Sequence, residues 1–248
     1  MKKNFFILWF MGLLGAAAVL PYAFTLQHEI LAKANQPLLV IVLASIAQTA
    51  VLLAVAIFFG LKLSTSLNLP VLTLFTPEAL KKEKFPNFFK LTVLAGIITA
   101  VLITLGDKIF GLYLPQLAVV NGQVAIWKTL LASHYGGIVE ELLMRLFIMS
   151  LFAFVLAKIF KSLEPVKNNI IMWLAIIISS VLFGLGHLPI TSALTAITPL
   201  VVLRAIVLNG IGGIVFGWLY WKKGLEYGMV AHFTADIVLL AILPALLK

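Results

Sequence analysis

Cysteine is absent from this chain of 248 residues, and charged residues are scarce. Without cysteine the protein has no disulfide, no thiolate metal ligand and no cysteine nucleophile. Charged residues make up 11% of the chain, whereas a soluble domain carries about a quarter. Hydrophobic residues make up 62%, and the mean hydropathy is +1.14. The composition excludes a water-soluble globular fold and predicts an integral membrane protein.

Negative charge is also in short supply, and the net charge is +9. The positive residues lie at the ends of apolar runs, where they orient helices and meet anionic lipid headgroups. We therefore expect the lipid bilayer, and no nucleic acid, as the partner of this charge. Arginine occurs only at Arg145 and Arg204. We expect Arg204 to mark a helix end, with its guanidinium reaching the membrane interface.

Long uncharged runs predict an all-α fold, a polytopic bundle of transmembrane helices. A spanning helix needs about 20 apolar residues. The uncharged or nearly uncharged runs are 4–27, 34–61, 91–106, 109–127, 129–157, 168–203, 205–221 and 227–247. We expect one membrane domain over residues 1–248, in which 1–128 carry no motif and 129–248 form the catalytic core.

Three of the N-terminal segments need separate interpretation. No clear small-residue cleavage site follows run 4–27, so we expect a retained first span rather than a signal peptide. Segment 62–90 mixes prolines with charges and is expected to be a loop with an interfacial helix. Segment 109–127 contains Pro115 and several amides, which favours an interfacial or re-entrant segment over a span.

Two adjacent carboxylates, Glu140 and Glu141, interrupt an apolar segment, and Arg145 follows them. A charge at the bilayer centre costs about 3 kcal/mol on the insertion scale. Glu141 and Arg145 are four residues apart, so they share a helix face and can pair. Glu140 points about 100° away and has no partner within its own helix. This arrangement favours a general base at Glu140, with a structural polar cluster as the alternative.

Two further apolar segments each bring a histidine. His187 closes the segment Phe183-Gly-Leu-Gly-His187, and His232 precedes Asp236 by four residues, on one helix face. Taken singly, each histidine could be a hydrogen-bonded core residue. Taken together with Glu140, these side chains are the types that activate water or bind a divalent metal. The pair Gly213 and Gly217 indicates tight helix packing instead.

The order of these motifs resembles that of a known family. Glu-Glu-x-x-x-Arg, Phe-x-x-x-His, a glycine-rich helix ending in Lys-Lys-Gly, and His-x-x-x-Asp occur in sequence between residues 129 and 240. The pattern resembles the CAAX-processing and bacteriocin-processing (CPBP, or Abi) intramembrane proteases, which include the type II prenyl endopeptidases. The resemblance implies that Glu140 activates water with help from His187, and that His232 and Asp236 stabilise the oxyanion or position the substrate. The supporting residues that it implies are Glu141, Arg145 and Phe183.

Asp236 departs from the pattern, because many members have Asn at this place. An amide can donate a hydrogen bond to an oxyanion, whereas an ionised Asp cannot. The alternative role of Asp236 is to orient His232.

The family has been described both as metal-dependent and as using glutamate directly. Two histidines and a carboxylate with an open position form a known zinc site, so zinc is the alternative, with Glu140, His187, His232 and Asp236 as ligands. The chain has no His-Glu-x-x-His helix, which would be a stronger metal signal. We favour a mechanism without metal or other cofactor.

The expected function is an intramembrane endopeptidase that cleaves a membrane-associated or lipidated peptide. A proton-coupled transporter, against which the lack of an inverted repeat counts, and a non-catalytic scaffold or immunity factor are the alternatives. We expect a multi-pass protein of a prokaryotic cell membrane.

The number of spans is open between eight and seven. A seven-span ladder places most basic residues on one side of the membrane. Run 168–203, however, is 36 residues long and is interrupted by Pro189 and Pro199. If it crossed twice, His232 would return to the side of the membrane that His187 reaches. We therefore prefer eight spans.

Overall fold

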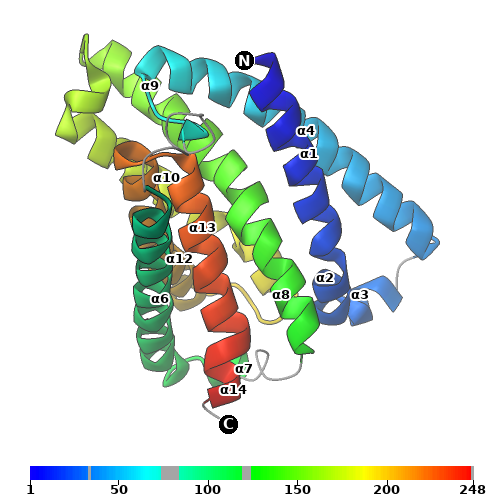
Figure 1. Cartoon of the computed structure of the whole chain (residues 1–248). Helices are drawn as coiled ribbons and strands as arrows, with labels where there is room; N and C mark the ends of the chain where they lie inside the picture. Colours follow the sequence, from blue (N-terminus) through cyan, green and yellow to red (C-terminus); the bar gives the residue numbers. More distant parts are fainter. Residues whose placement is uncertain (33–34, 74–83, 119–123, 247–248) are drawn as a thin grey trace.

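The structure is a computed structural model that describes residues 1–32, 35–73, 84–118 and 124–246. These residues form helices joined by turns, without a β-strand (Figure 1). Seven helical segments in this part of the chain are long and apolar enough to cross a membrane. They are Lys2–Leu26, Leu38–Leu67, Pro86–Gly111, Ile126–Ile159, Asn169–Ser192, Pro199–Lys222 and Leu225–Leu246. The all-α polytopic bundle is confirmed, and residues 2–26 form one of its helical segments.

The spans are built from shorter helical elements. In chain order they are α1 (Lys2–Ala18), α2 (Leu20–Leu26), α3 (His28–Ala32), α4 (Leu38–Leu67), α6 (Lys84–Gly111), α7 (Pro115–Ala118), α8 (Ile126–His134), η3 (Tyr135–Glu140), η4 (Leu142–Met149), α9 (Ser150–Ile159), η5 (Pro165–Lys167), α10 (Asn169–Gly186), α11 (Leu188–Ser192), α12 (Pro199–Lys222), α13 (Leu225–Ile237), η6 (Val238–Ile242) and α14 (Leu243–Leu246). The N-terminus of α1 lies at one end of the bundle and α14 lies at the opposite end (Figure 1). An odd number of membrane crossings requires this arrangement.

The preference for eight spans was wrong, and the seven-span alternative is confirmed. Run 168–203 crosses once, as α10 and α11, and α12 begins only at Pro199. The error lay in assuming that the site residues sit near the membrane faces. A Cβ built on Gly184 would lie 2.6 Å from Ile206 Cα, so the end of α10 packs on the second turn of α12. His187 therefore lies inside the bundle, and one crossing is enough to bring it to the site.

Both segments that we expected at the interface extend beyond the described residues. The expected interfacial helix within 62–90 would include 74–83, which lie outside them. In the second segment, residues 109–111 end α6, Pro115–Ala118 form α7, and 119–123 lie outside the described residues. No candidate span includes the described residues 112–118.

Glycines set the helix crossings that surround the site. A Cβ on Gly213 would touch Ser180, and one on Gly217 would lie 3.2 Å from Ile176, so the predicted tight packing at these glycines is confirmed, against α10. Gly60 packs on Leu146 in the same way. Large apolar side chains remain exposed on the outer faces of the helices, as a lipid environment requires.

Candidate active site

Glu141 is the buried centre of the polar cluster. Its Oε1 atom lies 3.0 Å from Arg145 Nη1, as predicted from the sequence, and 2.8 Å from His232 Nδ1. The Arg145 contact is an ion pair rather than a directed hydrogen bond, since neither Nη atom has a hydrogen-bond partner within the described residues. All three side chains are buried. One carboxylate thus ties two helices together and holds the imidazole of His232.

Aromatic rings enclose this cluster. The guanidinium carbon of Arg145 lies 4.8 Å from the ring centre of Phe183 and 5.5 Å from that of Phe216. Phe183 also meets the His187 ring edge-to-face at 4.8 Å, and Phe216 stacks on His232 at 4.5 Å. The two phenylalanines therefore pack the arginine and both histidines in place. The supporting role of Phe183 stays a prediction.

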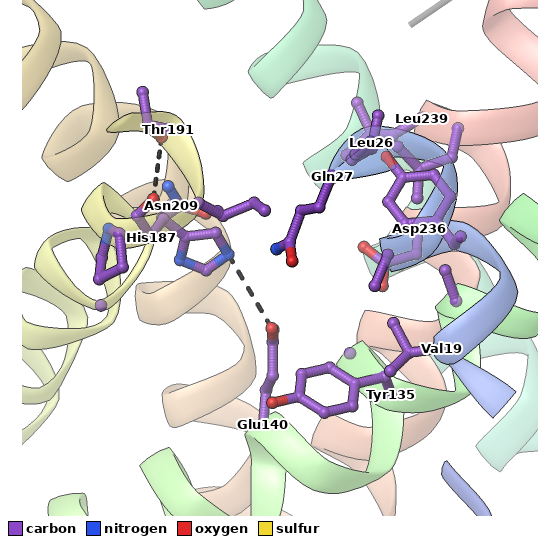
Figure 2. Close-up of a pocket in the computed structure, with 18 of the residues that line it drawn as sticks. Val19, Leu26, Gln27, Tyr135, Glu140, His187, Thr191, Asn209, Asp236 and Leu239 are labelled. Carbon is purple, nitrogen blue, oxygen red and sulfur yellow. Dashed lines mark hydrogen bonds and ion pairs between the residues drawn. The ribbon is translucent and has the colours of Figure 1, made fainter. Parts of the chain in front are cut away.

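Glu140 lies on the same helical segment as Glu141 and faces both histidines. Its Oε1 lies 3.9 Å from His187 Nε2 and its Oε2 lies 3.6 Å from His232 Nε2. His232 Nε2 is also 3.7 Å from Asp236 Oδ1. The structure thus brings together four residues that the sequence singled out, from η3, the junction of α10 and α11, and α13. Figure 2 shows Glu140 reaching toward His187 across the pocket.

The hydrogen bonds of the two rings determine which nitrogen is free. His187 Nδ1 lies 2.9 Å from the carbonyl oxygen of Phe183, which can only accept, so Nδ1 carries the proton. His232 Nδ1 likewise donates to the Glu141 carboxylate. Each neutral ring therefore presents an Nε2 lone pair to Glu140. His232 could donate from Nε2 only as an imidazolium.

A π-helical turn and two glycines bring Glu140 against α13. Residues 135–140 form the π-helix η3, a geometry that occurs often at functional sites. A Cβ on Gly136 would collide with Asp236 and lie 3.1 Å from His232 Nε2. A Cβ on Gly137 would lie 2.7 Å from Phe233 Cβ. Only glycines at these two positions allow α13 to approach η3 closely enough to assemble the site.

A cavity of about 800 Å³ opens beside these groups. Glu140, His187, His232 and Asp236 all line it. Its other walls come from α1, α2, α4 and α12, so the motif-free half of the chain contributes to the cavity. The polar groups therefore face a space that can hold water and an extended substrate.

Several polar residues of the cavity wall were not predicted from the sequence. Among them are Gln27, Tyr135 and Asn209, which Figure 2 shows around the same space. Gln27 and Asn209 carry no motif signal. Tyr135 could have been found, because it begins the segment that leads into Glu140.

Arg204 makes an ion pair that the sequence did not predict. Its Nε and Nη2 atoms lie 2.8 and 2.6 Å from Asp107 Oδ1 of α6. Arg204 also lines the cavity. The partner is 97 residues away in sequence, so local spacing could not reveal this ion pair.

The donor set was also compared with what a metal ion requires. Two imidazole Nε2 atoms and two carboxylates suit zinc chemically. Among the described residues, however, no group of three or more His, Cys, Asp or Glu side chains is placed so as to hold a metal ion. The side chains as they lie in the described part of the chain do not fit a resident metal.

Comparisons with known proteins bear on the same region. Residues 122–238 match the family described as type II CAAX prenyl endopeptidase, Rce1-like. The match covers every residue of the polar cluster. No curated protein and no solved structure matches the chain. Residues 122–238 of this multi-pass membrane protein are thus similar to the Rce1-like family of CAAX-type proteases.

Proposed function

We propose that the protein is a glutamate-dependent intramembrane endopeptidase that hydrolyses a peptide bond of a membrane-associated or lipidated peptide. The observation that supports this most is the convergence of Glu140 with two imidazole Nε2 atoms, at 3.9 and 3.6 Å, on the wall of a cavity within apolar helices. A peptidase needs a base, an activated water and a donor for the oxyanion.

The first step is activation of water. A water molecule between Glu140 Oε1 and His187 Nε2 would donate one hydrogen bond to each, since both atoms are acceptors. As the water oxygen attacks the carbonyl carbon, one proton passes to Glu140 and the new C–O bond forms. The carbonyl electron pair moves onto its oxygen, which becomes the oxyanion.

The second step is expulsion of the amine. The oxyanion re-forms the carbonyl and the C–N bond breaks. Glu140 returns its proton to the leaving nitrogen and becomes a carboxylate again. The products are a carboxylic acid and an amine, which account for every atom of peptide and water. His232 in its imidazolium form would donate from Nε2 to the oxyanion, held by Glu141 on one side and Asp236 on the other.

The walls of the cavity support this substrate class. Apolar residues of α1, α2 and α4 line part of the cavity. A lipidated or membrane-embedded peptide can bury apolar surface there, which a free polar peptide cannot. The family description, with its prenylated CAAX tail, fits this chemistry.

The test is cleavage of a fluorogenic peptide that ends in a prenylated Cys-aliphatic-aliphatic-Met, by purified protein in liposomes. We expect wild type to cleave the prenylated peptide and to spare its unprenylated counterpart. Glu140→Gln keeps the shape but cannot accept the proton, so kcat should fall by about 10²–10⁴-fold. Mass spectrometry of the products locates the broken bond.

Glu164→Gln is the matched control, because Glu164 is exposed and pairs with Lys167 at the surface. Equal cleavage by wild type and Glu140→Gln would refute the base role. A chelator arm tests the metal-free mechanism: a rate that is lost with chelator and restored by zinc would refute it. Cleavage of neither peptide by wild type would contradict the proposed substrate class.

A further inference from the structure

The site as described is short of hydrogen-bond donors for an oxyanion. His187 Nδ1–H is committed to the Phe183 carbonyl, and His232 Nδ1–H is committed to Glu141. An ionised Asp236 accepts only, although it occupies the place where an amide would donate. His232 Nε2 therefore supplies at most one donor, and only when the ring is charged.

Tyr135 is a neutral donor that lies close to Glu140. Its side chain lines the cavity and points toward Glu140 in Figure 2, and it lies within electrostatic range of the Glu140 carboxylate. Within the described part of the chain its hydroxyl makes no hydrogen bond that would occupy it. The phenol is therefore free to donate to a ligand in the cavity.

The π-helical turn explains why Tyr135 and Glu140 meet. In an α-helix two residues five apart point about 140° away from each other. A π-helix joins residue i to residue i+5, which brings such residues close to one face. Residues 135 and 140 are the first and last of η3, so this turn aligns the phenol with the carboxylate. A regular α-helix would turn the hydroxyl away from the cavity.

We propose that Tyr135 is an oxyanion donor of this enzyme, in place of the amide that Asp236 does not provide. Its hydroxyl donates to the substrate carbonyl oxygen while the water held by Glu140 attacks the adjacent carbon. No bond to Tyr135 is made or broken. The assignment rests on the proposed peptidase function, and it adds to that function a residue outside the motifs.

The experiment compares Tyr135→Phe with wild type on the prenylated fluorogenic peptide in liposomes. The change removes only the hydroxyl, so kcat should fall by about 10²-fold, with KM within about twofold of wild type. Tyr113→Phe is the matched control, because it is the same change at an exposed tyrosine that does not line the cavity. Its kcat should stay within about twofold of wild type. Equal thermal unfolding of the variants in detergent shows that Tyr135→Phe folds.

A rescue variant separates a lost donor from a structural defect. In the Tyr135→Phe background, Asp236→Asn supplies an amide donor and should restore kcat by about tenfold. The outcome that overturns the proposal is a Tyr135→Phe kcat equal to wild type while Glu140→Gln is inactive. That result leaves the proposed peptidase function standing, whereas an active Glu140→Gln would remove the function itself.

Gln27 is the competing donor, because its amide also enters the cavity, from the end of α2 (Figure 2). Gln27→Met keeps the length of the side chain and removes its donor. A loss of kcat in Gln27→Met with none in Tyr135→Phe would move the donor to α2 and overturn the assignment.

Discussion

At the residue scale, Glu141 shows how one buried carboxylate can serve two helices. The spacing of four residues predicted its pair with Arg145, and the structure confirms that pair at 3.0 Å. The second contact, to His232 Nδ1 at 2.8 Å, joins residues 91 apart in the chain. It determines which His232 nitrogen faces Glu140. Glu141 is therefore expected to influence both stability and activity.

Glu141→Gln tests this double role. The change leaves the Arg145 cation buried without its counter-charge, which should lower the free energy of unfolding by about 3–5 kcal/mol. It also replaces the carboxylate that orients His232, so kcat should fall as well. Chemical unfolding in detergent and the peptide assay measure the two effects. Unfolding that matches that of Glu164→Gln, a change at the surface, would contradict the prediction.

At the element scale, the close contact between η3 and α13 depends on two glycines. Gly136 and Gly137 leave room for Asp236, His232 and Phe233, which a Cβ would displace. The π-helical turn rotates the helix face so that Glu140 points into the cavity that α13 also lines. Motif spacing within a single helix does not predict this contact, because the contact depends on residues of the facing helix.

Gly137→Ala tests the contact between η3 and α13. The new Cβ would lie 2.7 Å from Phe233 Cβ and 2.9 Å from the Met229 carbonyl oxygen. Relief requires the helices to separate, which should cost about 1–3 kcal/mol and lower kcat. Gly210→Ala is the matched control, since nothing lies within 4 Å of its Cβ. If Gly137→Ala has the same stability and activity as Gly210→Ala, the two helices can separate at this contact without cost, and the prediction is wrong.

The ion pair between α6 and α12 is a second link at this scale. Either Arg204→Leu or Asp107→Leu leaves a partly buried charge without its partner inside a span. The double variant removes both charges, so it should be more stable than the two single losses together predict. We expect a coupling energy of about 0.5–3 kcal/mol in a double-mutant cycle of unfolding. If the effects of the two single variants on the free energy of unfolding are additive, the ion pair does not contribute to stability.

At the scale of the whole molecule, the seven-span topology satisfies both the charge bias and the site. The ladder favoured by the positive-inside rule is the one the structure shows. The site assembles within the bundle because Glu140 lies near the middle of the 34-residue span Ile126–Ile159. From there its carboxylate reaches His187 on one side and His232 on the other.

Cysteine labelling tests this topology, and the cysteine-free chain provides a clean background. With seven spans, Lys161→Cys and Lys223→Cys lie on one side of the membrane and Tyr113→Cys on the other. We expect a membrane-impermeant maleimide to label Tyr113→Cys in intact cells, and the other two only after permeabilisation. Labelling of Lys161→Cys and Lys223→Cys on opposite sides would instead support the eight-span arrangement.

The sequence by itself determined the fold class, the Glu141–Arg145 pair, the glycine packing at Gly213 and Gly217, and the resemblance to a CAAX-type protease family. These follow from hydropathy, helical periodicity and motif order, which are properties of neighbouring residues. The roles of Glu140, His187, His232 and Asp236 were also inferred at that level and stay predictions until the variants are assayed.

Only the tertiary structure decided how these residues meet. The seven crossings, the bridge from Glu141 to His232, the Arg204–Asp107 pair and the placement of Tyr135 beside Glu140 all depend on the depth and offset at which helices cross. Uniformly apolar spans carry little information about depth, because shifting one helix against another leaves the hydropathy of each unchanged. In this chain the offsets depend instead on glycine contacts and a π-helical turn, which act between elements far apart in sequence.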